Sequence, residues 1–192
     1  MPRIIAGEKK GLRLKSPQGK NTRPTTDRIK ETIFNILSPY IENSTVLDVF
    51  AGTGSLGIEA LSRGGKSATF IENNKGCSDI IKSNLEFTGY NNVSDVIYMS
   101  VAAAIKMLSQ NNAKFDMIFM DPPYCKNFIA STLQNLIING IISSEGIVVI
   151  ERSVNEKLFS TDFPFEDYLI LKREESFKET IISFLVMKPC GP

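Results

Sequence analysis

The feature that most constrains the fold is a regular alternation, from Thr45 onward, of short β-rich runs with segments of helical periodicity. Strands are predicted at 45–50, 67–72, 95–99, 115–120 and 146–151, with helices at 55–63, 75–88, 101–110 and 128–139. Strands that alternate with helices in this way form a parallel sheet, and the helices cover both of its faces. The sequence therefore predicts an α/β fold.

The two ends of the chain depart from this alternation. Near the C-terminus, the β-rich runs 168–172 and 180–187 are joined by a charged loop with no helix long enough for a crossover, which predicts an antiparallel hairpin at one sheet edge. Near the N-terminus, the apolar runs 3–6 and 12–14 flank a charged turn with glycines, which predicts a β-hairpin.

Another helix is predicted between the N-terminal hairpin and the alternating region. Thr25 or Thr26 can cap it, its apolar residues recur at spacings of three and four, and it is expected to end before Pro39. The chain has 192 residues, of which 42% are hydrophobic, enough for one compact domain. We therefore predict a single domain over residues 1–192, in which residues 1–24 form a basic N-terminal extension.

The charge of the chain is unevenly distributed. The net charge is +1, but residues 1–30 hold nine lysines or arginines against two acidic residues, a net charge of +7, and the remainder carries −6. A basic arm on an acidic body favours a polyanionic partner, although a solvated, loosely ordered tail is the alternative. No apolar run has the length of a signal peptide or a membrane span, so we expect a cytoplasmic protein with no membrane partner. Nothing in the sequence indicates an obligate dimer, and a monomer is expected.

The composition limits the side chains that could act in catalysis or bind a metal. The chain has no histidine, which removes the commonest general base and the commonest metal ligand. Its cysteines, Cys77, Cys125 and Cys190, are too few and too scattered for a disulfide framework or a metal site. Catalysis is therefore expected to depend on carboxylates, backbone groups or a cofactor, with no metal.

The most informative segment, VLDVFAGTGSLG, is a predicted strand that runs directly into a glycine loop and a helix. Gly52, Gly54 and Gly57 satisfy a G-x-G-x-x-G pattern, which lets a ligand approach the backbone at a helix N-terminus. Asp48 suits the amino group of a methionine-bearing cofactor better than the pyrophosphate of a dinucleotide. Glu72 closes the second strand, where it can accept hydrogen bonds from ribose hydroxyls of either cofactor. The pattern alone is shared with NAD enzymes.

A second motif, Asp-Pro-Pro-Tyr, follows the strand predicted at 115–120. The carboxylate of Asp121 and the carbonyl of Pro122 are placed to accept the two N–H groups of an exocyclic amino group, which would orient its nitrogen for attack on a sulfonium methyl. Tyr124 could stack on the base, a contact worth roughly 1–3 kcal/mol. The alternative is an acidic strand end followed by a proline turn.

Together these motifs resemble the Rossmann-like methyltransferases that modify exocyclic amino groups. The N-terminal segments RIIAG, RPTTDR at 23–28 and KETIFNIL at 30–37 are similar to the RsmD family, and the resemblance covers essentially the whole chain. It implies a Rossmann-like fold with a seven-stranded, mostly parallel sheet. It also implies S-adenosylmethionine as donor, S-adenosylhomocysteine as product, and N2 of a guanine in 16S ribosomal RNA, free or in the small ribosomal subunit, as acceptor.

The resemblance also implies which residues serve the reaction. The expected cofactor-binding residues are Asp48, Phe50, Gly52, Gly54, Glu72, Ser100 and Asp121, and the expected catalytic residues are Asp121, Pro122 and Tyr124. Ser100 is included because the family's usual Asp or Asn at the adenine is absent here, and Ser100 is the nearest polar side chain. Arg13, Lys15, Arg23 and Arg28 are the expected RNA-binding residues.

Three other functions remain open at this point. A DNA amino-methyltransferase would share the Asp-Pro-Pro-Tyr motif, but the chain leaves little room for a separate target-recognition domain. A nucleotide-binding or RNA-binding module without catalysis would have no use for Asp121 and the two prolines. An NAD-linked oxidoreductase would leave Asp48 without a role.

Overall fold

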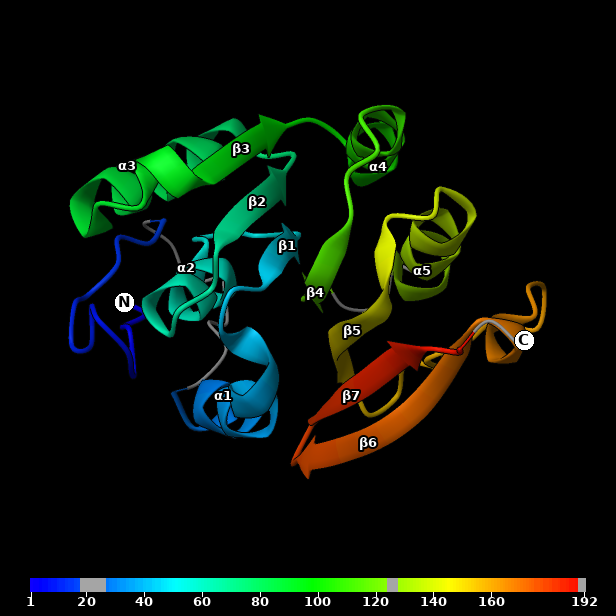
Figure 1. Ribbon diagram of the computed structural model, residues 1–192. Helices are drawn as coiled ribbons and strands as arrows, with labels where there is room; N and C mark the ends of the chain where they lie inside the picture. Colours follow the sequence, from blue (N-terminus) through cyan, green and yellow to red (C-terminus); the bar gives the residue numbers. More distant parts are fainter. Residues whose placement is uncertain (18–26, 124–127, 190–192) are drawn as a thin grey trace.

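The computed structural model describes residues 1–17, 27–123 and 128–189, and its centre is a seven-stranded sheet (Figure 1). The strands are β1 (Thr45–Val49), β2 (Ser67–Glu72), β3 (Ser94–Tyr98), β4 (Phe115–Met120), β5 (Ile142–Ser153), β6 (Leu169–Phe177) and β7 (Thr180–Met187). The α-helices are α1 (Asp27–Ile41), α2 (Ser55–Ser62), α3 (Lys75–Thr88), α4 (Val101–Gln110) and α5 (Phe128–Ile138). Two short 3-10 helices, η1 (Asn91–Val93) and η2 (Phe165–Asp167), lie in the connections.

The strand order is β3-β2-β1-β4-β5-β7-β6. Strands β1 to β5 pair in parallel, as the alternation predicted. The chain builds outward from β1 through β2 to β3, and then returns to place β4 on the other side of β1. The boundary between β1 and β4 is therefore the topological switch point, where ligands bind in open α/β sheets, beyond the carboxyl ends of the strands.

Helices cover both faces of the sheet, as expected (Figure 1). On one face, α1, α2 and α3 pack in a core that includes Phe34, Ile58 and Ile81. On the other face, α4 and α5 pack in a second core that includes Ile105 and Leu133. The strands between them are buried on both sides, which explains why their sequences are almost continuously apolar.

The predicted C-terminal hairpin is confirmed, but the loop within it is much shorter than expected. Strand β7 pairs antiparallel with both β5 and β6, and β6 forms the edge of the sheet. The charged residues 173–175, expected in a loop, continue β6, because an edge strand can point charged side chains into solvent while its backbone pairs with β7.

The predicted end of the first helix before Pro39 is wrong. Helix α1 runs through Pro39 to Ile41. Pro39 removes one backbone hydrogen bond of the helix, and only two helical residues follow it. The last turn is held by Ile41, which is buried in the core with the rest of the apolar stripe. The predicted caps, Thr25 and Thr26, lie outside the described residues.

The predicted N-terminal β-hairpin is present only as a turn with minimal strand pairing. The chain doubles back, since the N–H of Ile4 donates to the carbonyl of Leu12 and the N–H of Gly11 donates to the carbonyl of Ile4, but the pairing amounts to one isolated antiparallel bridge between Arg3 and Arg13. The backbone N–H groups of Ile5 and Ala6 donate to the Glu59 carboxylate on α2 instead of to a partner strand. Residues 1–17 are thus docked on the body beside α2 and α3, not held as a loose tail (Figure 1).

Candidate active site

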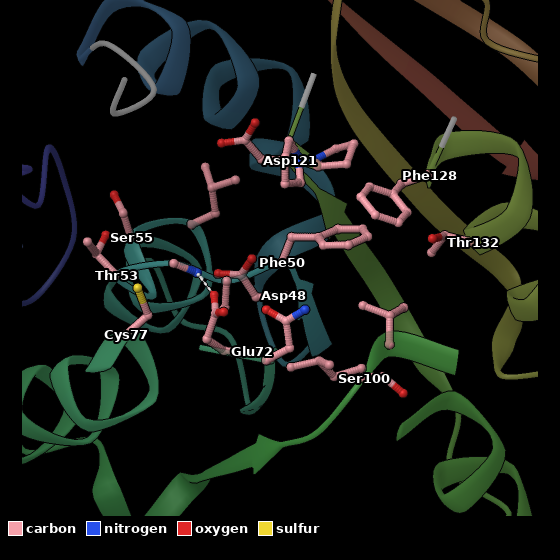
Figure 2. Close-up of a pocket in the computed structure, with 18 of the residues that line it drawn as sticks. Asp48, Phe50, Thr53, Ser55, Glu72, Cys77, Ser100, Asp121, Phe128 and Thr132 are labelled. Atoms are coloured by element: carbon pink, nitrogen blue, oxygen red, sulfur yellow. Dashed lines mark hydrogen bonds between the residues drawn. The ribbon is translucent and has the colours of Figure 1, made fainter. Parts of the chain in front are cut away.

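A cavity of about 1000 Å³ lies at the carboxyl ends of β1, β2 and β4, at the switch point. This volume is at the upper end of the roughly 300–1,000 Å³ typical of small-molecule sites. It brings together most of the predicted site residues, which come from separate parts of the sequence: Asp48, Phe50, Gly52, Glu72, Ser100, Asp121 and Pro122 (Figure 2). The cavity can therefore accommodate a nucleoside-sized ligand and leave room for a second group beside it.

The glycine loop between β1 and α2 has the tight geometry that its sequence requires. Gly52 and Gly54 have φ angles of +56° and +74°, in the left-handed region that glycine adopts without strain. Phe50 has a φ of +62°, which is uncommon for a residue with a side chain. Such strain is found mainly where the surrounding structure holds a ligand site in place. Gly54 does not line the cavity. It is the loop residue that faces the core, where a Cβ would meet the side chains of Phe70 and Ile81 at 3.3 Å.

The third glycine of the motif is required for packing. A Cβ built on Gly57 would lie 2.4 Å from a ring carbon of Phe70 and 3.3 Å from a carboxylate oxygen of Asp48. The Phe70 ring is fully buried and has no space to withdraw. Gly57 therefore lets α2 approach the sheet closely enough for its N-terminus to face the end of β1.

Asp48 is almost completely buried at the floor of the cavity. Its carboxylate accepts a hydrogen bond from the backbone N–H of Gly57 at 2.9 Å, which satisfies one of the unpaired donors at the start of α2. Burial raises the pKa of Asp48 to about 7, although the Gly57 hydrogen bond and the charge of Lys30 act in the opposite direction. A cationic group that enters the cavity would relieve this penalty, because it would favour the ionised carboxylate.

Glu72 holds the glycine loop from the neighbouring strand. One carboxylate oxygen accepts the N–H of Gly52 at 2.8 Å (Figure 2), and the other accepts the N–H of Asn74 at 2.8 Å. A carboxylate has about four acceptor positions, so two remain after these bonds. Glu72 can therefore hold the loop and accept ribose hydroxyls at the same time.

The end of β4 brings the second motif to the same cavity. Val49 pairs with Met120, so the loop that follows β1 begins beside Asp121. Asp121, Pro122 and Pro123 all line the cavity, and Pro122 is buried. Tyr124 lies outside the described residues, and so does Cys125.

Sequence reasoning missed the wall that α5 contributes. The ring centroids of Phe128 and Phe50 lie 5.7 Å apart, and both residues line the cavity. Farther along the same helix, Ser131, Thr132 and Asn135 also line it (Figure 2). A signal was present, since the first turn of the helix that follows a strand in an α/β unit lies at the ligand edge of the sheet.

The N-terminal segment forms another part of the wall that the sequence did not predict. Met1, Pro2, Ser16 and Pro17 line the cavity. No periodicity signals this placement, because it depends on contacts with distant buried side chains.

The predicted RNA-binding residues are distributed around this segment. Arg13 and Lys15 are exposed, and the Lys15 ammonium donates to the hydroxyl of Ser83. Both cations belong to the segment that contributes Ser16 and Pro17 to the cavity wall. Arg28 is exposed near the start of α1 and is not part of the cavity lining, and Arg23 lies outside the described residues.

The described residues show neither a metal-binding cluster nor a membrane-spanning helix. Across residues 1–17, 27–123 and 128–189, no three His, Cys, Asp or Glu side chains gather in a way that could hold a metal ion. In the same ranges, no helix combines the length and apolar character needed to cross a membrane.

The comparisons with known proteins identify the family. The model of the family described as Conserved hypothetical protein 95 matches residues 2–185. The Haemophilus influenzae protein named ribosomal RNA small subunit methyltransferase D is 37% identical over 173 residues, which cover 90% of this chain and 87% of that protein. The chain belongs to this family, the RsmD family.

Solved structures agree with this assignment. The Escherichia coli protein yhhF is similar with a TM-score of 0.82 and 31% identity, over 98% of each chain. The Thermus hypothetical protein TTHA0928 is similar with a TM-score of 0.80 and 25% identity, over 96% of this chain and 98% of that one. The α/β architecture and the C-terminal antiparallel hairpin of this RsmD-family chain are therefore those of its structural relatives.

Proposed function

We propose that this RsmD-family chain transfers a methyl group from S-adenosylmethionine to the exocyclic N2 amino group of a guanine in 16S ribosomal RNA. The observation that carries the proposal is that one cavity holds the Asp-Pro-Pro turn after β4 together with the glycine loop and the acidic ends of β1 and β2. The relatives named as small-subunit ribosomal RNA methyltransferases support the choice of acceptor.

The residues present fit S-adenosylmethionine. Asp48 is a buried carboxylate suited to the amino group of the methionine part, and Glu72 retains acceptor positions for the ribose hydroxyls. Gly52 and Gly54 keep the loop compact, Phe50 offers an apolar ring, and Ser100 opens α4 beside the cavity without capping its own helix. When bound, the cofactor supplies an electrophilic methyl group on its sulfonium.

Asp121 and Pro122 would act on the acceptor. The amino nitrogen of a base is a poor nucleophile, since its lone pair is delocalised into the ring. A carboxylate oxygen of Asp121 and the carbonyl oxygen of Pro122 would each accept one N–H, which orients the nitrogen and stabilises the positive charge that develops on it. Asp121 then lies between acceptor and cofactor and serves both, while Tyr124 would stack on the base. This chemistry needs neither a histidine nor a metal.

The basic residues would hold the RNA backbone. Arg13, Lys15, Arg23 and Arg28 are assigned to phosphates, with residues 1–24 acting as an RNA-contacting extension of a single domain over residues 1–192. Arg13 and Lys15 are exposed on the segment that contributes Ser16 and Pro17 to the cavity wall, which supports this assignment. A ribosomal RNA substrate also fits a cytoplasmic enzyme that acts as a monomer on free RNA or on the small subunit.

A substitution at Asp121 tests the proposal. Asp121→Ala should lower kcat for methyl transfer by about 100- to 1,000-fold, the effect of removing one group that stabilises transition-state charge. Binding of S-adenosylhomocysteine, measured by calorimetry, should change much less, because Asp48 and Glu72 remain. Full turnover in the Asp121→Ala protein would contradict the catalytic assignment. Binding of NADH instead of S-adenosylhomocysteine by the unmodified protein would contradict the cofactor.

A further inference from the structure

Two buried side chains connect the N-terminal segment, residues 1–17, to residues of the glycine loop and the start of α2 that line the cavity. Both belong to helices of the body, neither lines the cavity, and the mechanism proposed above uses neither. One is Lys30 in the first turns of α1, and the other is Asn84 in α3. The exposed fraction of each is 0%.

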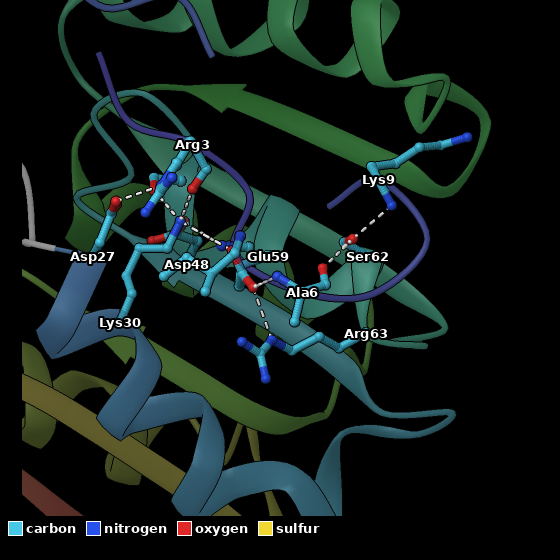
Figure 3. A network of polar contacts seen from close by, with 12 residues as sticks. Arg3, Ala6, Lys9, Asp27, Lys30, Asp48, Glu59, Ser62 and Arg63 are labelled. Carbon is cyan, nitrogen blue, oxygen red and sulfur yellow. Dashed lines mark hydrogen bonds and ion pairs between the residues drawn. The ribbon is translucent and has the colours of Figure 1, made fainter. Parts of the chain in front are cut away.

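Lys30 makes the first connection (Figure 3). Its ammonium donates to the backbone carbonyl of Arg3 at 2.8 Å and to the hydroxyl of Ser55 at 3.1 Å, and it pairs with the carboxylate of Glu59 at 3.1 Å. Three partners use all three N–H donors of the ammonium. Ser55 is the first residue of α2 and lines the cavity, so Lys30 joins the N-terminal segment to the start of that helix.

Glu59 extends this connection. Its carboxylate accepts the backbone N–H groups of Ile5 at 2.8 Å and Ala6 at 3.0 Å, and it also accepts the guanidinium of Arg63 at 2.8 Å (Figure 3). Burial lowers the pKa of Lys30, and the charge of Glu59 opposes that shift. A buried ion pair of this kind stabilises only when its remaining hydrogen-bonding positions are also satisfied, and here the backbone of the N-terminal segment satisfies them.

Asn84 makes the second connection, independent of the first. Its amide oxygen accepts the backbone N–H of Lys15 at 2.8 Å, and its amide nitrogen donates to the backbone carbonyl of Lys15 at 3.1 Å. The other hydrogen of the same nitrogen is directed to the backbone carbonyl of Thr53 at 3.0 Å. Thr53 is part of the glycine loop and lines the cavity. One amide group therefore holds both the glycine loop and the segment that carries the exposed cations.

We propose that Asn84 and Lys30 are positioning residues that tie residues 1–17 to the glycine loop, so that the two parts become ordered together. A ligand that orders Thr53 and Ser55 then also orders Arg13 and Lys15, and RNA bound to those cations in turn favours the ligand-binding form of the loop. Such coupling is reciprocal and typically changes each affinity by 5- to 150-fold. The inference rests on the proposed function, since it assigns the adenosyl cofactor to the loop and RNA to the segment.

Calorimetry with S-adenosylhomocysteine and fluorescence anisotropy with a 16S ribosomal RNA fragment test the coupling. In the unmodified protein, saturating S-adenosylhomocysteine should tighten RNA binding at least fivefold. Asn84→Ala should weaken S-adenosylhomocysteine binding about 5- to 10-fold and lower the coupling factor several-fold, because only the connection through Lys30 remains. If S-adenosylhomocysteine does not bind the unmodified protein at all, the proposed function fails and the inference fails with it.

Thr88→Ala is the matched control. Thr88 lies one turn farther along α3, is 2% exposed, and its hydroxyl donates to the carbonyls of Asn84 and Leu85 within its own helix. The variant therefore loses a buried hydrogen bond to the helix backbone but keeps the Asn84 side chain and its three hydrogen bonds, and both affinities and the coupling should be retained. A folded Asn84→Ala protein with unchanged coupling, or equal losses in the two variants, would overturn the inference.

Hydrogen exchange on the unmodified protein tests the same proposal without relying on a variant that folds. The amides of Ile5, Ala6 and Lys15 donate to Glu59 and Asn84, so their exchange reports on the two connections. Saturating S-adenosylhomocysteine should slow their exchange several-fold, although the ligand-binding loop lies elsewhere in the chain. Unchanged exchange at these amides, with protection confined to residues 48–57, would overturn the proposal.

Discussion

Replacing Asp48 by Asn should make the protein more stable and a poorer binder of its cofactor. Burial raises the pKa of Asp48 from its ordinary value of 3.8 to about 7. Its folded-state pKa therefore lies above the unfolded value, so its contribution to stability is largest below about pH 4 and is lost as the pH rises through 7. A shift of about three pKa units corresponds to about 4 kcal/mol, the upper limit of the penalty at pH 8.

Asparagine has nearly the same shape, and its amide oxygen can still accept the N–H of Gly57, but it carries no charge to bury. Asp48→Asn should thus raise the free energy of unfolding at pH 8 by up to about 4 kcal/mol, and have little effect at pH 4. Chemical denaturation at the two pH values measures this difference. The same change removes the anionic partner of the cofactor's amino group. S-adenosylhomocysteine should bind about 10- to 100-fold more weakly, because hydrogen bonds to charged groups contribute about 1.5–3 kcal/mol.

The pH dependence of binding provides an independent check. In the unmodified protein the affinity for S-adenosylhomocysteine should fall as the pH decreases below 7, whereas the Asp48→Asn protein should show no such dependence between pH 5 and 8. Lower stability of Asp48→Asn at pH 8, or an unchanged affinity, would refute the reasoning.

Asp116→Asn is the control. Asp116 lies at the opposite end of β4, where burial raises its pKa but hydrogen bonds from Thr45 and Ser143 outweigh that effect and lower it. Its carboxylate therefore stabilises the fold above its unfolded pKa, and the contribution is lost as the pH falls. Asp116→Asn should reduce stability at pH 8, with a smaller effect at low pH, and leave S-adenosylhomocysteine binding unchanged.

Three further predictions concern packing, the buried ion pair and the basic segment. Gly57→Ala should lower the free energy of unfolding by about 1–3 kcal/mol in urea denaturation, because the added methyl group would overlap the fixed ring of Phe70; a neutral effect would contradict the packing argument. Glu59→Gln should cost about 3–5 kcal/mol in the same assay, because it leaves the charge of Lys30 buried without its partner; a loss under 1 kcal/mol would be inconsistent with that pairing. Arg13→Ala should reduce the slope of log affinity against log salt for RNA by about 0.7–0.9, and an unchanged slope would remove this residue from the interface.

The parts of the fold that follow from local sequence pattern were predicted well. Each of strands β1 to β5 contains a short apolar run between segments of helical periodicity, and this pattern predicted their parallel pairing. Strand β5 extends beyond its predicted run of 146–151 in both directions, from Ile142 to Ser153. The hydrophobic pattern was less informative about the bounds of an element when buried and exposed residues follow one another along it. Strand β6 carries charged residues at 173–175 because it is an edge strand, and its position in the sheet cannot be inferred from its own sequence.

The residues that line the cavity were also predicted only in part. Asp48, Glu72 and Asp121 lie at or directly after the carboxyl ends of three strands, and parallel strands bring these ends to one edge, so their proximity followed from the topology. The contribution of Phe128 could have been anticipated from its place at the start of a helix after the Asp-Pro-Pro turn. The packing of residues 1–17 against the cavity could not, because it depends on Asn84, which in sequence is an ordinary polar residue of an amphipathic helix.

The most direct test of the proposed function is transfer of labelled methyl from S-adenosylmethionine to small ribosomal subunits, or to their RNA, from cells that lack the enzyme. Nucleoside analysis of the labelled RNA then identifies the modified atom. We expect label in N2-methylguanosine alone, and its loss in the Asp121→Ala protein. Label in a different nucleoside, or no transfer to any RNA, would contradict the assignment of a guanine amino group to the Asp-Pro-Pro end of the cavity.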